Sequence, residues 1–297
     1  MTATSVQKKK LFNERKVRLP AAFIMRRVHS LLGLWLVIYL FEHLLVNSQL
    51  AFYFQDNGHG FIHMVNKIHE LPYLKLIEIF LLAIPFLIHG SWGLLYLKTS
   101  KPNSHKTRGN IPNLSKYERN HAYTWQRWTS WILIVGIFAH VIHMRFVDSP
   151  HLIYQGIDHY YVTKVSVDPG LYNVVNQLNV TLVDQQEIAQ IETLKQRPLR
   201  EGEVIAMSPN AGIAFLLVAR EAFKNPLIVI LYSILVLSAA FHGFNGLWTF
   251  LISWGITLTR RSQKILRYFC QGFMILVAIM GLAAAWGTYI IVYIQGV

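Results

Sequence analysis

The chain has 297 residues, of which 53% are hydrophobic and only 14% are charged, whereas soluble proteins carry roughly 25% charged residues; two soluble domains, which the length alone would allow, are therefore disfavoured. A net charge of +13 would suit a nucleic-acid-binding protein only if the basic residues lay on a polar, foldable surface. The single cysteine, Cys270, excludes an internal disulfide, a multi-thiolate metal site and a haem attached through a C-x-x-C-H motif.

Five apolar stretches are each long enough to form a helix across a bilayer, which takes about 20 residues. They run over residues 28–50, 73–97, 125–146, 226–256 and 265–294. The polar segment before the first stretch has no apolar region of its own, so it does not read as a cleaved signal peptide. We therefore predict an all-α fold, a transmembrane bundle of five helices with a long external insertion between the third and fourth spans.

This pattern divides the chain into four parts. We expect a basic cytoplasmic segment at 1–27, three transmembrane helices within 28–147, an extracytoplasmic insertion with an interfacial helix at 148–225, and two transmembrane helices within 226–297. Within the insertion, Asp168-Pro169-Gly170 marks a turn, and residues 184–196 read as a short helix. Residues 211–223 are apolar and read as an interfacial helix or as the lead-in to the fourth span.

The basic residues gather on one side of the predicted bundle. The segments 1–27, 98–124 and 257–267 hold 18 of the 28 Lys and Arg residues. Because cytoplasmic loops are enriched in Lys and Arg, we expect a multi-pass protein of a bacterial-type inner membrane, with its N-terminus in the cytoplasm and its C-terminus outside. The charge then records orientation and predicts no nucleic-acid partner. It also suits docking of a soluble partner or contact with anionic lipid.

Six of the 13 histidines lie in or at the edge of the predicted spans. They are His29, His43, His89, His140, His143 and His242. An ionisable residue inside the membrane suggests a functional site, and the alternative is a hydrogen bond between helices. The helical rise puts His43 and His140 roughly 20–24 Å from the inner end, and His89 roughly 13 Å from it. Topology therefore predicts an outer pair, His43 with His140, and an inner pair, His89 with His242.

The surroundings of these histidines suit a flat, acidic cofactor. His89 and His242 both begin an H-G-x-x-G-L pattern, whose glycines allow either a ligand or another helix to approach closely. Two histidines from different helices can clamp a haem b. Polar residues at the inner ends are candidates to hold its propionates, although the arginines could equally be membrane anchors. These candidates are Arg27, His29, Ser30, Gln126 and Arg127. Zinc or copper would require three or four ligands that converge on one point, and four histidines divided between two depths fit that requirement poorly.

Several stretches resemble the cytochrome b membrane anchors of succinate:quinone oxidoreductases, in the form with one polypeptide, five spans and two haems. The resemblance covers all five spans in order. It rests on Arg26–Gly33 (RRVHSLLG), Glu42–Asn47 (EHLLVN), Leu71-Pro72 through His89, Gln126-Arg127-Trp128-Thr129 through His140, and Phe241-His242 through Ser262-Gln263. The insertion between the third and fourth spans is longer than this family leads us to expect.

The resemblance implies two bis-histidine haems b, with His89 and His242 on the haem nearer the cytoplasm and His43 and His140 on the other. It implies a flavoprotein partner with FAD and an iron–sulfur partner on the cytoplasmic side. The chain would be the electron-transfer and quinone-reacting subunit of a succinate dehydrogenase or fumarate reductase, acting on a quinone of the menaquinone type. Glu70 matches in placement a glutamate that serves quinol chemistry in some relatives, so we expect either a proton carrier or a solvated loop acid.

Two other functions remain open from the sequence. One is the di-haem cytochrome b anchor of another respiratory dehydrogenase, such as a formate dehydrogenase or a hydrogenase. The other is a non-haem membrane transporter whose histidines relay protons.

Overall fold

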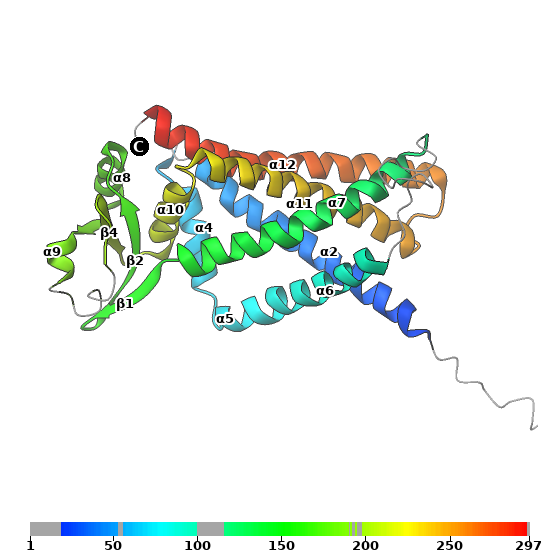
Figure 1. The fold of residues 1–297 in the computed structure, drawn as a ribbon, viewed down its shortest axis with the longest axis horizontal. Coiled ribbons are helices and arrows are strands. Elements are labelled where there is room, and N and C mark those ends of the chain that lie inside the picture. Colours follow the sequence, from blue (N-terminus) through cyan, green and yellow to red (C-terminus); the bar gives the residue numbers. More distant parts are fainter. Residues whose placement is uncertain are drawn as a thin grey trace, which may run out of the picture.

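A computed structural model describes residues 19–52, 56–99, 116–189, 191, 194 and 198–295. Most of the predicted N-terminal segment 1–27, and much of the basic loop 98–124, lie outside these residues. Long helices run side by side in an elongated bundle, and a smaller mixed unit lies at one end of it (Figure 1). The last helix ends at the same end as this unit, whereas the first helix begins at the opposite end.

Within the described part of the chain, five helices are long and apolar enough to cross a membrane, which confirms the predicted five-helix bundle. The first span joins α2 (Ala21–Ser48) to the short turn η1 (Gln49–Phe52). The second joins α5 (Leu74–Ile77), η2 (Glu78–Ala83) and α6 (Ile84–Thr99). The third joins α7 (Glu118–Val141) to η3 (Ile142–Val147), and the last two are α11 (Pro226–Ser253) and α12 (Arg260–Gln295).

Apolar side chains cover the outward faces of this bundle. Val135 and Phe138 on the third span are each 70% exposed, which is the arrangement of side chains that face lipid. Inside, α2, α11 and α12 enclose a core that includes Leu44, Phe244 and Val277. The helices therefore bury one stripe against each other and leave the remaining apolar surface for the bilayer.

Two of the spans change to π-helix toward the end that carries the insertion. The segments η2 and η3 are π-helical, a conformation that is rare and recurs at functional sites. Arg145 of η3 donates a hydrogen bond to Glu78 of η2 over 2.7 Å. This ion pair connects the second and third spans.

The insertion folds around a sheet that the sequence analysis did not predict. Four antiparallel strands pair in the order β1-β2-β4-β3. In chain order the elements are β1 (His151–Gln155), β2 (Asp158–Ser166), α8 (Pro169–Leu178), β3 (Thr181–Val183), α9 (Gln185–Ile188), β4 (Glu203–Ser208) and α10 (Ala211–Ala222). The helix expected over 184–196 begins after Asp184, but α9 has only four residues.

Both faces of this sheet are covered. Helices α8, α10 and α4 (His59–His69) pack on one face through residues such as Phe61, Leu171 and Leu217. Ile188 and Leu194 cover the other face at Val162 and Ile205. The apolar run over 211–223 is therefore explained by burial, because α10 is the core helix of the unit rather than an extension of α11.

A partly buried ion cluster, centred on the buried Arg220, fastens α8 to the end of α10. Asp168 accepts a hydrogen bond from the Leu171 N–H at the start of α8, and two more from Arg220 at 2.6 and 3.0 Å. The Lys224 ammonium lies 2.6 Å from the same carboxylate and also bonds Glu221. Burial opposes ionisation of Asp168, but hydrogen bonds and charge from Arg220 and Lys224 hold its pKa well below the usual range.

Replacing Gly212 with alanine is expected to loosen the contact between α10 and α4. A Cβ at position 212 would lie 2.5 Å from the backbone oxygen of Ile62, and backbone cannot move aside as a flexible side chain can. Overpacking of this kind costs roughly 1–3 kcal/mol, so the insertion should be cleaved faster by protease. Gly272→Ala is the matched control, since a Cβ there meets nothing within 4 Å; equal protease sensitivity of the two variants would contradict the packing argument.

Candidate functional site

Four histidines from four different spans meet in two pairs inside the bundle. The outer histidine pair, His43 of α2 and His140 of α7, lies toward the insertion, with ring centroids 5.9 Å apart. The inner histidine pair, His89 of α6 and His242 of α11, lies toward the opposite end, with centroids 6.5 Å apart. These are the two pairs that the topology predicts.

The separation of the rings suits one metal atom between each pair. A metal bound by two imidazoles lies about 2 Å from each coordinating nitrogen, which places the two ring centroids about 6 Å apart. Among the described residues, no group of three or more His, Cys, Asp or Glu side chains could hold a metal ion. The three histidines of α4 (His59–His69), namely His59, His63 and His69, form no such group either. Two-histidine ligation of a haem iron fits this donor set.

Hydrogen bonds hold the inner pair through the nitrogen Nδ1. His89 donates from Nδ1 to the backbone oxygen of His29 over 3.0 Å. The Nδ1 of His242 lies 3.5 Å from the Thr129 hydroxyl and 3.4 Å from the Ser130 hydroxyl. Both hydroxyls donate their own hydrogens to carbonyl groups of α7, so they can only accept from His242. Such contacts fix ring orientation and leave Nε2 as the free ligand atom.

The outer pair is held by a tyrosine. The Tyr232 hydroxyl of α11 lies 3.1 Å from Nδ1 of His140 and 3.1 Å from Nδ1 of His143. His143 in turn contacts Asp148 through Nε2 at 2.9 Å. On the other histidine of this pair, the ring of Tyr39 stacks on His43 with centroids 5.6 Å apart. Both ring nitrogens of His143 are therefore occupied, Nδ1 by Tyr232 and Nε2 by Asp148.

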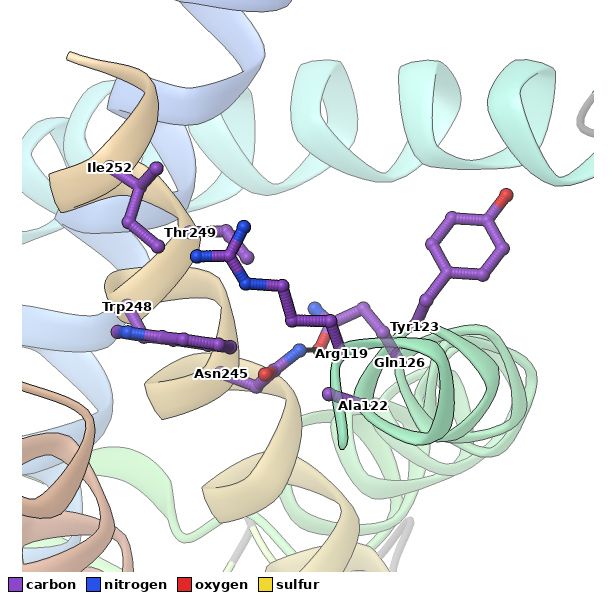
Figure 2. Close-up of a pocket in the computed structure, with 8 residues that line it drawn as sticks. All are labelled: Arg119, Ala122, Tyr123, Gln126, Asn245, Trp248, Thr249 and Ile252. Carbon is purple, nitrogen blue, oxygen red and sulfur yellow. Dashed lines mark hydrogen bonds between the residues drawn. The ribbon is translucent and has the colours of Figure 1, made fainter. Parts of the chain in front are cut away.

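A pocket of about 370 Å³ opens beside the inner pair, between α7 and α11. Asn245 and Thr249 continue the helix face of His242 by one and two turns. Arg119 reaches across from α7 toward Trp248 and Thr249, and Gln126 meets Asn245 between the helices (Figure 2). The pocket is thus lined by a cation, amides and a hydroxyl just inward of the histidines. Groups of this kind suit the carboxylates of a haem.

Gln126 is a positioning residue for the inner pair as well as a wall of this pocket. Its amide donates to the backbone oxygen of His242 over 3.1 Å and accepts from Asn245 over 2.7 Å. Arg119, Tyr123 and Asn245 were not among the sequence-predicted site residues. Their spacing with Gln126 and His242 on shared helix faces was the signal that could have identified them.

The other predicted propionate-binding residues divide into two groups. Arg27 donates to the Ser253 carbonyl and lies over the Trp254 ring, and Ser30 accepts from the Trp254 indole. These two therefore fasten α2 to the end of α11. In contrast, the buried Nδ1 of His29 and Nε of Arg127 have no hydrogen-bond partner within the described part of the chain. Two orphaned buried polar atoms near the inner pair are compatible with an acidic ligand.

The glycines of the two H-G-x-x-G-L patterns have different surroundings. A Cβ at Gly90 would meet nothing within 4 Å, whereas one at Gly243 would lie 3.2 Å from Val37 of α2. Gly33 on α2 is the closest of all to a candidate ligand, because a Cβ there would lie 3.0 Å from the His89 ring. Helix packing explains Gly243, and close approach to a ligand side chain explains Gly33.

Glu70 lies apart from both pairs. It follows α4, its side chain is 62% exposed, and it bonds Lys67 at 2.8 Å. The hydrogen bond and the charge of Lys67 lower the pKa of this carboxyl below its ordinary value. The side chain is therefore ionised at neutral pH at the rim of the bundle.

Comparison with known proteins relates the sequence of this chain to that of a cytochrome subunit. The chain is 26% identical over 263 residues to the succinate dehydrogenase cytochrome b558 subunit of Bacillus subtilis strain 168, a match that spans 88% of this chain and 95% of the relative. No protein-family model and no solved structure matches the chain. The match runs along nearly the whole of both proteins, and it confirms that this chain resembles the cytochrome b membrane anchors of succinate:quinone oxidoreductases.

Proposed function

We propose that this chain is the membrane anchor and cytochrome b subunit of a succinate dehydrogenase complex. The observation that carries the proposal is the presence of two histidine pairs, built by four spans at two depths. The relative of matching length is named as a cytochrome b558 subunit of succinate dehydrogenase, which favours this complex over other respiratory dehydrogenases. It also favours haem chemistry over a histidine proton relay.

Each pair would hold one haem b, with His89 and His242 on the inner haem and His43 and His140 on the outer haem. A bound haem supplies a one-electron carrier whose iron alternates between the ferrous and ferric states. Ser130 beside His242 and the outer ligand His140 are ten residues apart on α7, so the two levels are separated by about 15 Å along the helix. The Nδ1 contacts of His89, His140 and His242 would hold these three rings in place as ligands.

The electron route would join the two sides of the membrane. A flavoprotein partner with FAD would oxidise succinate, and an iron–sulfur partner would carry the electrons to this chain. The electrons would enter at the inner haem and pass to the outer haem. There they would reduce a quinone, which the family resemblance suggests is of the menaquinone type. The basic end of the bundle, where Arg260, Arg261 and Lys264 begin α12, would face the cytoplasm and dock these partners. Fumarate reduction by quinol would use the same route in reverse.

Succinate-driven reduction of the haems tests this function. Membranes that carry the assembled three-subunit complex should show a b-type absorption band when succinate is added, and the band should decay when a menaquinone analogue is supplied. Dithionite serves as the control that reduces every haem regardless of the route. A band that appears with dithionite but never with succinate would contradict the assignment to succinate dehydrogenase.

We also propose that Glu70 is the entry point for protons that a quinone takes up at the outer end. Its exposure to solvent and its position at the rim support this role. Glu70→Gln should lower quinone-linked turnover by roughly 10²-fold, as for a residue in proton transfer, while the haem spectrum and haem content stay unchanged. Glu201→Gln, which changes an exposed glutamate of the insertion, is the control; unchanged turnover in Glu70→Gln would remove Glu70 from the proton route.

A further inference from the structure

Beyond the outer pair, a continuous chain of hydrogen bonds leads from His140 to a carboxylate. It runs from His140 Nδ1 to the Tyr232 hydroxyl at 3.1 Å, from that hydroxyl to His143 Nδ1 at 3.1 Å, and from His143 Nε2 to Asp148 at 2.9 Å. His140 belongs to α7, Tyr232 to α11 and His143 to η3, and Asp148 directly follows η3. We call Tyr232, His143 and Asp148 the outer relay.

Counting hydrogens fixes the direction of every bond in this chain. If His140 binds iron through Nε2, its Nδ1 carries a hydrogen and donates it to the Tyr232 oxygen. The Tyr232 hydroxyl has a single hydrogen, which is then free to be donated to Nδ1 of His143. A neutral His143 that accepts at Nδ1 must carry its hydrogen on Nε2, where the Asp148 carboxylate accepts it. All donors therefore point away from His140 and toward the negative charge.

Packing keeps the relay in place. The Tyr232 ring packs against Phe223 with centroids 5.2 Å apart and belongs to a cluster that contains the fully buried Val229. The backbone N–H of Asp148 donates to the His143 carbonyl over 2.9 Å, so the carboxylate and its histidine partner are joined twice. Tyr232 is thus held between two imidazoles rather than free to rotate toward lipid.

Among the residues that the structure describes, the inner pair has no equivalent chain of hydrogen bonds. The Nδ1 of His89 meets a backbone carbonyl, and the Nδ1 of His242 meets two hydroxyls whose hydrogens go to α7 carbonyls. Both inner ligands therefore end on neutral acceptors, whereas His140 ends on a carboxylate through two intermediates. This difference between the two pairs gives the relay a specific expected effect.

We propose that the outer relay positions His140 and increases its basicity as a ligand, which lowers the reduction potential of the outer haem alone. The proposal rests on the haem-binding function proposed above. Carboxylates that act on a ligand histidine through hydrogen bonds raise ligand basicity and fix ring orientation. A more basic ligand favours the ferric over the ferrous state. Tyr232, His143 and Asp148 act through His140 and are positioning residues.

Redox titration of the purified complex, with the two haems resolved by their spectra, tests the relay. Tyr232→Phe removes the hydroxyl that joins the relay to His140, so the outer potential should shift upward while the inner potential stays constant. Asp148→Asn keeps an acceptor for His143 but removes the charge, so it should shift the outer potential in the same direction by a smaller amount. The electron paramagnetic resonance signal of the outer ferric haem should change in Tyr232→Phe almost as much as in the double variant that carries both Tyr232→Phe and Asp148→Asn.

Tyr289→Phe is the matched control, because Tyr289 packs in the same cluster as Tyr232 but makes no hydrogen bond to a histidine within the described part of the chain. It should leave both potentials unchanged. The relay would be overturned if Tyr232→Phe and Asp148→Asn both kept the wild-type outer potential, or if both haems shifted equally. Should Tyr232→Phe lose the outer haem, Asp148→Asn alone decides. A complex without two b-type haems would instead refute the proposed function.

Discussion

Replacing His140 with alanine is expected to remove the outer haem and to leave the inner haem in place. His242→Ala should do the reverse, because the two pairs share no histidine. Each proposed haem would then keep only one histidine ligand, and no covalent bond would retain it in the chain. The haem content of the purified chain should fall from two to one in each single variant and to none in the double variant.

His63→Ala provides the control for these substitutions. His63 lies exposed on α4, outside both pairs, so this variant should keep both haems with unchanged spectra. Full haem content in both His140→Ala and His242→Ala would contradict the ligand assignment. Loss of both haems from a single variant would show instead that the two sites fold together.

Replacing Asp168 with alanine is expected to cause the largest loss of stability in the insertion. The substitution leaves Arg220, which is only 4% exposed, without its carboxylate partner. It also removes the side chain that accepts a hydrogen bond from the Leu171 N–H at the start of α8. Breaking a buried ion pair costs about 3–5 kcal/mol; the Asp168 side chain is itself 28% exposed, so solvent screening places the effect near the lower bound. Denaturation followed by proteolysis of the insertion would measure it.

Asp184→Ala is the matched control for Asp168→Ala, because Asp184 also caps a helix but contacts no buried cation. Its loss should cost about 1 kcal/mol. Equal destabilisation by the two variants would mean that Arg220 gains nothing from Asp168. A larger effect of Asp168→Ala attributes the difference to the buried pair.

The ion pair between Asp168 and Arg220 makes the stability of the insertion depend on pH. The pKa of Asp168 in the folded protein is lowered below its unfolded value, which is about 3.9. Its contribution to stability is therefore complete above that unfolded value and is lost as the pH falls through the folded pKa. The stability difference between wild type and Asp168→Ala should stay constant from neutral pH to about 5 and shrink below about 4.

The bundle and its histidine pairs could be predicted because both follow from one-dimensional patterns. Apolar length predicts the spans, the Lys and Arg residues predict which span ends lie on the same side, and the helical rise converts positions such as His43 and His140 into depths. The pairing needed only these depths. The contacts that hold each ring could not be predicted, because Tyr232 and Thr129 meet their histidines through helix rotation, which a sequence period does not define.

The sheet was missed for a different reason. Its strands are three to nine residues long, and both faces are covered, so the alternation of polar and apolar residues that marks a half-exposed strand is weakened. The apolar run of α10 was predicted to be an interfacial helix or the lead-in to the fourth span, because nothing in the sequence identified the strands that bury it. Asp168, predicted only as part of a turn, proved to be the residue that joins α8 to α10.

The ratio of haem b to protein in the purified chain tests the central claim most directly. A dithionite-reduced minus oxidised spectrum, calibrated against protein concentration, should show b-type absorption and two haems per chain, since two histidine pairs lie at two depths. A ratio near one would leave one pair without its proposed cofactor. The absence of any b-type band would contradict the whole assignment.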